Sequence, residues 1–426
     1  MADKTIFFSV GEPSGDLHGA NLIRSLMEIH PGYRFVGYGG PKMKAAGCEL
    51  HEDLTQLAVM WFLRVLLNLH RFIGLLRKAD RYFQQERPDA VVLIDYPGFN
   101  WWIARRAKAR GIPVFYYGVP QLWGWAPWRI KKMRRLIDHG LCKLPFEEKW
   151  FRDRGCNVTY VGHPYFDELA NRRLDQSFVS SISSARDSES PLVTLLPGSR
   201  DQEITSNLPA FLDVVEKVQS ESKSARFAVA SFKPAHATKA KDMIAERGLD
   251  VEVYQGRTPE LIEAADVCLA CSGSVSLELL YHTTPSIIQY KISPMAFRLQ
   301  NRFRIARYIT LVNLLETDRI ERRPGEHYDP DEDAADSVPM PEYLSHEDCS
   351  TAIARRVLKL LTDKEGYERN RERLKQLREK YALPGASQRA AEYISMTLGM
   401  KSSIAPPPHF RQSGHIDGTR KESTRT

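Results

Sequence analysis

Short apolar runs alternate with longer amphipathic segments along the first 170 residues of the chain. The apolar runs are rich in Val, Ile, Phe and Tyr, as expected for strands that are buried on both faces of a sheet. The segments between them keep polar residues on one face at helical spacing. Predicted strands cover 5–10, 33–38, 90–95, 113–117, 140–142 and 158–161, and predicted helices cover 15–29, 56–86, 100–110 and 147–154. This alternation predicts a doubly wound parallel sheet.

A polar stretch at 171–190 separates this pattern from a second one like it. The stretch holds seven serines between Ser177 and Ser190, and we interpret it as a linker. Predicted strands follow at 192–196, 226–230, 250–254, 267–271 and 285–290. The fold class is therefore α/β, with Rossmann-like domains at 1–170 and 191–398 that face a central cleft. Residues 399–426 are rich in Ser, Pro, His and basic side chains, which predicts a disordered tail.

Composition agrees with two soluble domains. The chain has 426 residues, of which 42% are hydrophobic and 27% charged, which excludes a disordered chain or a disulfide scaffold. Cys268 and Cys271 fall in a predicted buried strand without further ligands nearby, so we expect no metal site. The N-terminal apolar run is too short for a signal peptide, and no apolar stretch is long enough to span a membrane. We therefore expect a cytoplasmic protein.

The charge balance suggests an anionic partner without selecting one. Lys and Arg total 60 against 53 Asp and Glu, a net charge of +7. Phosphate, a nucleotide and an acidic membrane surface all suit this excess.

In the first domain, candidate site residues follow the predicted strands, because ligands of open α/β sheets bind beyond the carboxyl ends of strands. Glu12 and Ser14 lie in a glycine-rich turn after the first strand, and the alternative is a plain strand-to-helix turn. Asp95 ends an almost wholly apolar strand, where a partly desolvated carboxylate can act as a general base. The alternative for Asp95 is a helix cap.

In the second domain, two turns between a strand and a helix carry similar signals. Gly198 and Ser199 offer backbone N–H groups, and Arg200 can pair with a phosphate. The turn Ser272, Gly273 and Ser274 precedes a helix whose N-terminus favours anions. Glu278, about one turn further on, can accept hydrogen bonds from two ribose hydroxyls. A solvated loop and a solvated glutamate are the alternatives.

Aromatic and basic residues cluster in three segments. Trp61, Phe62, Leu63 and Arg64 lie in an amphipathic stretch that suits acyl chains or a membrane interface, or else burial against the sheet. Trp123, Trp125 and Trp128 precede a basic run at 129–135, and 297–308 interleaves arginines with Phe and Tyr. Because no nucleic-acid-binding motif accompanies these clusters, we do not expect a nucleic-acid partner.

Several of these motifs occur together in a known order. The chain resembles the lipid-A-disaccharide synthases over residues 5–395, and the order and spacing of the motifs are more specific than any single one. The motifs are GEPSGD at 11–16, FVGYGGP at 35–41 with Met43, LAVM at 57–60, IDYPGFN at 94–100, WGW at 123–125, LPFE at 144–147, GH at 162–163, LPGSR at 196–200, SGS at 272–274, LE at 277–278, YK at 290–291 and VNLL at 312–315.

The resemblance implies a GT-B glycosyltransferase that inverts the anomeric carbon. The implied donor is UDP-2,3-diacylglucosamine and the acceptor is 2,3-diacylglucosamine 1-phosphate. The products are then a lipid A disaccharide 1-phosphate and UDP. The resemblance implies no cofactor and no metal, and a peripheral place on the anionic inner face of the cytoplasmic membrane. A homodimer is left open beside a monomer.

The resemblance also implies roles for particular residues. Asp95 matches the base that deprotonates the acceptor 6-hydroxyl, and Glu12 and Ser14 would lie near the acceptor. The donor residues would be Gly198, Ser199, Arg200, Ser272, Gly273, Ser274, Glu278 and, lining the donor pocket, Asn313.

Two other classes of protein remain as alternatives. One is a GT-B enzyme for another UDP-sugar, such as a peptidoglycan transferase or an epimerase, because fold does not fix function. The other is a non-catalytic protein that binds anionic lipid or nucleic acid. Loss of activity on substitution of Asp95 would separate an enzyme from a binding protein.

Overall fold

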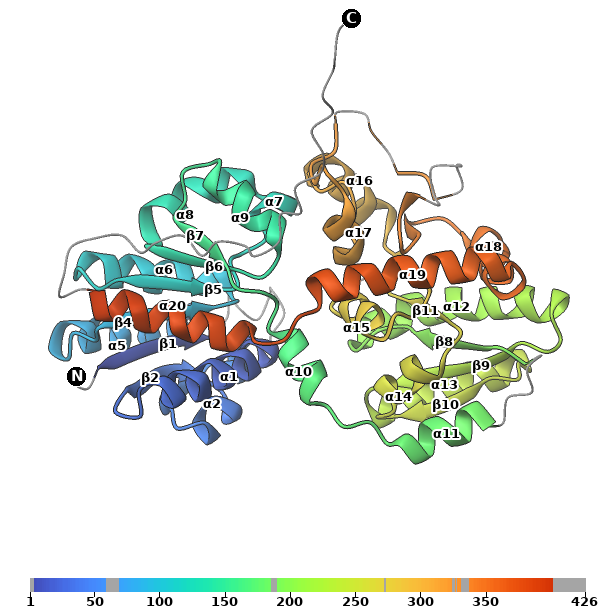
Figure 1. Cartoon of the computed structure of the whole chain (residues 1–426), viewed down its shortest axis with the longest axis horizontal. Helices are drawn as coiled ribbons and strands as arrows, with labels where there is room; N and C mark the ends of the chain where they lie inside the picture. The colour runs from blue at the N-terminus through green and yellow to red at the C-terminus, as the bar shows by residue number, and fades with distance from the viewer. Residues whose placement is uncertain are drawn as a thin grey trace, which may run out of the picture.

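Two parallel sheets, each covered by helices, form the two lobes of the molecule (Figure 1). The computed structural model describes residues 4–58, 69–184, 190–271, 273–323, 326, 328–330 and 337–400. Within these residues, no helix is both long and apolar enough to cross a bilayer.

The first sheet has seven strands in the order β3-β2-β1-β4-β5-β6-β7. Its order reverses at β1 and β4, so the crevice beyond the carboxyl ends of these two strands is the expected ligand site. The strands are β1 (Thr5–Val10), β2 (Arg34–Gly39), β3 (Glu49–Asp53), β4 (Ala90–Ile94), β5 (Val114–Tyr117), β6 (His139–Cys142) and β7 (Val158–Tyr160).

The second sheet has six strands in the equivalent order, β10-β9-β8-β11-β12-β13. Its order reverses at β8 and β11, which places a second crevice there. The strands are β8 (Leu192–Leu196), β9 (Arg226–Ser231), β10 (Glu252–Gln255), β11 (Val267–Ala270), β12 (Ser286–Lys291) and β13 (Glu342–Ser345). The predicted α/β class with two Rossmann-like sheets is confirmed.

Helices connect the parallel strands and cover both faces of each sheet (Figure 1). The predicted helix 56–86 corresponds to α3 and α5, and residues 59–68 between them lie outside the described part. The helices are α1 (Pro13–Ile29), α2 (Pro41–Ala45), α3 (Thr55–Ala58), α5 (Leu69–Gln85), α6 (Pro97–Ala109), α7 (Leu122–Trp125), η1 (Pro127–Arg129), α8 (Ile130–Leu136), α9 (Pro145–Arg152), α10 (Tyr165–Asn171), α11 (Gln176–Ser184), α12 (Asp201–Glu221), α13 (Pro234–Arg247), α14 (Thr258–Ala264), α15 (Val275–His282), α16 (Pro294–Phe303), α17 (Leu311–Glu316), α18 (Ser350–Thr362), α19 (Lys364–Tyr381) and α20 (Ala386–Met400).

The last helix belongs to the first lobe, which corrects the predicted domain boundary at 398. In Figure 1, α20 lies along the first lobe beside α1. Its buried face carries Ala390, Ala391, Ile394 and Leu398, which share a core with strands β1 and β4. Ala386 and Ala390, four residues apart and buried, let α20 pack closely against α1. The chain therefore crosses between the lobes a second time before this helix.

The predicted linker at 171–190 is also shorter than expected. Residues 176–184 form α11, which packs against α14 of the second lobe. Ile182 is buried and the Phe178 ring meets Tyr254 edge to face. The many serines made this apolar face hard to recognise in the sequence. The face packs α11 against the second lobe.

Candidate active site

A strained turn after β4 presents the Asp95 carboxylate. Asp95 and Tyr96 both adopt left-handed backbone conformations, with φ of 49° and 43°. Such a conformation costs about 1–2 kcal/mol for each non-glycine residue, so surrounding contacts must hold it.

Two side chains fix the backbone of this turn. The Asp95 carbonyl accepts hydrogen bonds from Asn100 Nδ2 at 2.8 Å and from the Tyr116 hydroxyl at 2.7 Å. Asn100 is itself buried, and the Ser9 hydroxyl donates to its Oδ1 at 2.7 Å. These bonds hold the Asp95 main chain and leave its carboxylate for other partners.

The Asp95 carboxylate lies between a glycine and a lysine. A Cβ atom on Gly15 would lie 3.1 Å from Asp95 Oδ2, so the absence of a side chain there gives the carboxylate its place. Lys143 Nζ lies 3.6 Å from Asp95 Oδ1, and the two side chains are only 16% and 20% exposed. Lys143 follows β6, so three strand ends contribute to this region.

Glu12 lies in the turn between β1 and α1 and Ser14 in the first turn of α1, both at the exposed rim. Partial desolvation first, and the charge of Asp95 second, raise the pKa of Glu12. Lys143 and Arg200 oppose this rise, so Glu12 lies within electrostatic reach of both lobes. Glu12 and Asp95 therefore lie within electrostatic reach of each other.

Two buried histidines complete this region and were not among the predicted site residues. The His18 and His163 rings meet edge to face, with centroids 6.5 Å apart. Burial lowers the pKa of His18 to about 4 and that of His163 well below its usual value, so both are neutral at neutral pH. Both histidines could have been found from the sequence, because His18 lies one helical turn after Ser14 and His163 follows β7.

In the second lobe, the backbone of the turn after β8 is hydrogen-bonded to Glu203 in the following helix. Gly198 has φ of 126°, and Glu203 Oε2 accepts hydrogen bonds from the backbone N–H groups of Ser199 at 2.9 Å and Arg200 at 3.1 Å. In this structure the Ser199 N–H, predicted to be offered to a ligand, donates to Glu203 instead. The reason is a capping box, in which a glutamate at the third helical position satisfies the helix N-terminus.

The Arg200 side chain and the second turn remain open to solvent. Arg200 contacts Glu203 Oε1 at 3.1 Å yet is 80% exposed. Gly273 and Ser274 are exposed at the start of α15, and among the described residues only the chain neighbours of Gly273 lie near a Cβ built on it. Ser272 lies outside the described residues, as do Trp61, Phe62, Leu63 and Arg64.

Glu278 and Asn313 already have partners. Glu278 is buried on α15, and its carboxylate accepts hydrogen bonds from the Tyr165 hydroxyl and the Arg172 guanidinium at the chain crossing. Asn313 Nδ2 donates to the Met340 carbonyl at 2.7 Å, and Asn313 Oδ1 accepts from the Met340 N–H at 3.1 Å. The expectation that Asn313 lines the donor pocket has no support in these contacts, which are internal to the second lobe.

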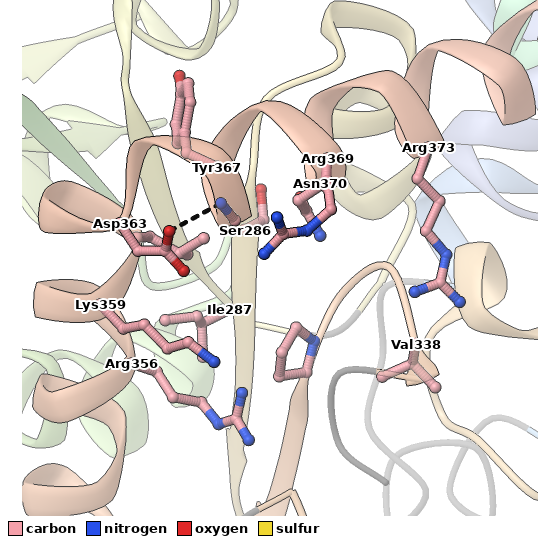
Figure 2. A pocket seen from close by; sticks show the side chains of 13 residues that line it. Ser286, Ile287, Val338, Arg356, Lys359, Asp363, Tyr367, Arg369, Asn370 and Arg373 are labelled. Carbon is pink, nitrogen blue, oxygen red and sulfur yellow. Dashed lines mark hydrogen bonds between the residues drawn. The ribbon is translucent and has the colours of Figure 1, made fainter. Parts of the chain in front are cut away.

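A basic pocket lies at the end of the second sheet that is opposite the crevice. The cavity has a volume of about 270 Å³. Figure 2 shows Arg356, Lys359 and Arg369 among the residues that line it. Ser286 and Ile287, the first residues of β12, form part of its wall, so it opens at the amino ends of the strands. It contains none of the predicted site residues, and we place the candidate active site in the crevices at the carboxyl ends.

Solved structures of other proteins share this two-lobed architecture. The calicheamicin glycosyltransferase CalG4 is 14% identical, with a TM-score of 0.59 over 95% of this chain and 100% of that one. A UDP-GlcNAc 2-epimerase from Neisseria meningitidis is 13% identical, with a TM-score of 0.56 over 92% and 99%. Such likeness establishes the fold alone, and the fold is GT-B.

The sequence identifies the family within this class. The lipid-A-disaccharide synthetase family matches residues 6–376. Lipid-A-disaccharide synthases from Trichlorobacter lovleyi and Syntrophus aciditrophicus are each 33% identical, over 92% and 94% of this chain and 97% and 100% of theirs. The chain belongs to the lipid-A-disaccharide synthase family, and it is a glycosyltransferase of lipid A disaccharide synthesis.

Proposed function

We propose that the chain transfers the sugar of UDP-2,3-diacylglucosamine to the 6-hydroxyl of 2,3-diacylglucosamine 1-phosphate, with inversion. The observation that carries the proposal is the Asp95 carboxylate at the switch point of the first sheet, on a turn held by Asn100 and Tyr116. Across the cleft, Arg200 lies within electrostatic reach of Glu12. The crevices of the two lobes thus offer a base on one wall and a cation on the other.

A single displacement accounts for the roles of these residues. Asp95 takes the proton of the acceptor 6-hydroxyl while that oxygen attacks the anomeric carbon from the face opposite UDP. The bond between the anomeric carbon and the UDP oxygen breaks, and its electron pair stays on UDP. Arg200 and the N–H groups at the start of α15 stabilise the negative charge that grows there, without a metal.

The other predicted residues take supporting roles in this proposal. Glu12 and Ser14 border the acceptor, and the 272–274 turn holds the donor diphosphate. Glu278 contacts the ribose, for which it must exchange at least one of its present hydrogen bonds. Asn313 acts indirectly, because its side chain holds the backbone at Met340.

We further infer that the enzyme works on the inner, anionic face of the cytoplasmic membrane. Helix α16 exposes Met295, Leu299 and Phe303, and Met295 is 79% exposed. Arg298 and Arg302 alternate with them on the same helix. The Ile305 N–H donates to the Gly124 carbonyl at 3.0 Å, so this helix ends beside α7 and the exposed Trp125. Apolar side chains flanked by cations suit a lipid interface and acylated substrates.

The reaction itself tests the proposed function. Purified protein is mixed with both proposed substrates in detergent with EDTA, and UDP release and disaccharide are measured by mass spectrometry. We expect disaccharide from the wild type and at least a hundredfold less from Asp95→Asn. UDP binding without disaccharide would contradict these substrates and would indicate another UDP-sugar and acceptor.

Membrane contact needs a separate test. Sedimentation with vesicles of phosphatidylglycerol and phosphatidylethanolamine is compared for the wild type and a Met295→Ser, Leu299→Ser, Phe303→Ser variant. We expect the variant to bind about tenfold more weakly, because three exposed apolar side chains no longer enter the lipid. A triple substitution of exposed Leu383, Met27 and Phe232 to Ser provides the control, with unchanged binding expected.

A further inference from the structure

We propose that the Tyr165 hydroxyl competes with the donor ribose for the Glu278 carboxylate, so that Tyr165 limits the affinity of the enzyme for UDP. This inference rests on the proposed function, in which Glu278 contacts the ribose. It assigns a role to a tyrosine of α10, outside the turns of the second lobe that are proposed to hold the donor.

The Glu278 carboxylate is covered by two hydrogen-bond donors from the chain crossing. The Tyr165 hydroxyl donates to Glu278 Oε2 at 2.5 Å, and the Arg172 guanidinium donates to Oε1. The Glu278 side chain is only 6% exposed. A ribose that binds Glu278 must therefore take the place of one of these two donors.

Tyr165 is the donor that leaves at the smaller cost. Arg172 forms an ion pair with Glu278 and a second one with Glu168, at 2.9 Å. Its departure would leave a buried carboxylate without a cation, which costs more than the exchange of one hydroxyl for another. Burial first, and then the charge of Glu278, raise the pKa of Tyr165. The tyrosine hydroxyl therefore keeps its proton and resembles a ribose hydroxyl as a donor.

Contacts other than Glu278 hold the helix that carries Tyr165. The Asp167 carboxylate, also on α10, accepts hydrogen bonds from the backbone N–H groups of Gly385 at 2.6 Å and Ser387 at 2.8 Å. These groups begin α20, which packs on the first lobe. Because α20 holds α10 in this way, the bond between Tyr165 and Glu278 can break without undoing the chain crossing.

Calorimetric titration of UDP and of 2′,3′-dideoxy-UDP tests the competition, because the dideoxy compound lacks both ribose hydroxyls. Tyr165→Phe should bind UDP about tenfold more tightly than the wild type, because no hydroxyl has to be displaced from a charged acceptor. Its affinity for dideoxy-UDP should stay within about twofold of the wild type, because that ligand offers no hydroxyl to Glu278. Tyr254→Phe is the matched control, with neither affinity changed, because the Tyr254 hydroxyl donates to the Glu252 carboxylate on the edge strand β10.

Thermal unfolding separates the competition from a structural role of Tyr165. Without UDP, Tyr165→Phe should unfold at a lower temperature than the wild type, because Glu278 Oε2 loses its donor. Saturating UDP should bring the two unfolding temperatures together, because ribose hydroxyls then bond to Glu278 in both proteins. A difference that persists in saturating UDP would make Tyr165 a structural residue and would overturn the proposal.

Two results of the titration would also overturn it. A UDP affinity of Tyr165→Phe equal to or below that of the wild type would show that Tyr165 does not compete with UDP. An equal gain for UDP and dideoxy-UDP would show that Tyr165 does not act through the ribose hydroxyls. If the wild type forms no disaccharide while Tyr165→Phe gains affinity for UDP alone, the proposed substrates are wrong and the competition stands, so the two failures are distinguishable.

Discussion

The two walls of the cleft are built in opposite ways. On the first wall, Asp95 and Lys143 are mostly buried, and hydrogen bonds from Asn100 and Tyr116 hold the Asp95 backbone. On the second wall, Arg200 is 80% exposed, and the backbone groups beside it bond to Glu203. The chain's own contacts thus fix the proposed base on the first wall, whereas the proposed donor groups on the second wall are exposed or bonded to Glu203.

This difference corresponds to the division of work in the proposed reaction. A general base must be placed within hydrogen-bond reach of the proton it removes, so its position cannot wait for substrate. A diphosphate carries enough charge to draw an exposed arginine towards it and to compete with Glu203. Substitutions in the first wall should therefore change turnover, and substitutions in the second should change donor binding as well.

The largest effect should come from the base itself. Asp95→Asn keeps the size of the side chain but removes the proton acceptor, so kcat should fall about 10²- to 10⁴-fold. Steady-state UDP release measures this fall. A kcat within fivefold of the wild type would remove Asp95 from the chemistry and end the distinction between the two walls.

On the second wall, Arg200→Ala should lower kcat/KM about 10²-fold, because charge on departing UDP loses its cation. The backbone capping by Glu203 does not need this side chain, so the fold should persist. Arg247→Ala is the matched control, because Arg247 pairs with Asp213 on the outer helices of the same lobe. Equal losses in the two variants would point to a general charge effect.

The buried first wall should also be sensitive to acid. The pKa of His18 is about 4 in the folded protein, and that of an exposed histidine is about 6.5. The unfolded chain therefore takes up the proton first, and stability is lost as the pH falls from 6.5 towards 4. Between pH 7.5 and 5 this costs the first lobe about 2 kcal/mol.

Urea unfolding at the two pH values measures this loss. His18→Gln, which carries no titrating group at that position, should lose less stability on acidification than the wild type. The same loss in both proteins would assign the acid sensitivity elsewhere.

A smaller effect should follow from crowding the base. A Cβ atom on Gly15 would lie 2.9 Å from Val10 Cγ1 and 3.1 Å from Asp95 Oδ2. Gly15→Ala should move the carboxylate by a few tenths of an ångström and lower kcat about tenfold, with UDP affinity unchanged. Gly74→Ala is the control, because no side chain of the described residues lies within 4 Å of a Cβ built there. Full activity of Gly15→Ala would show that the first wall tolerates displacement.

Much of this architecture was predictable because buried parallel strands are continuous apolar runs. β1, β4, β8 and β11 stand out for this reason, and their order marks both crevices. β3 was missed because it is a polar edge strand with the sequence ELHED, and β13 because it follows an irregular loop. The docking of α20 on the first lobe depends on tertiary contacts that no local pattern encodes.

Parts of the candidate site were predictable where the position of a single residue in the sequence identifies it. Asp95 and Glu12 follow strands, and the rule for parallel sheets places them correctly. Lys143 was missed because it follows β6, two strands away from β4 in the sheet. Its side chain reaches Asp95 by crossing Gly118 at the end of β5. The partners of Glu203 and Asn313 were missed because capping and burial, rather than ligand contact, determine their hydrogen bonds.

Calorimetric titration of UDP into the wild type, Asp95→Asn and Arg200→Ala tests the division between the two walls most directly. We expect Asp95→Asn to bind UDP within about twofold of the wild type, and Arg200→Ala about tenfold more weakly, because a charge-assisted pair is lost. If Asp95→Asn weakened UDP binding as much as Arg200→Ala, the base and the donor site would not lie on separate walls, and the account would be wrong.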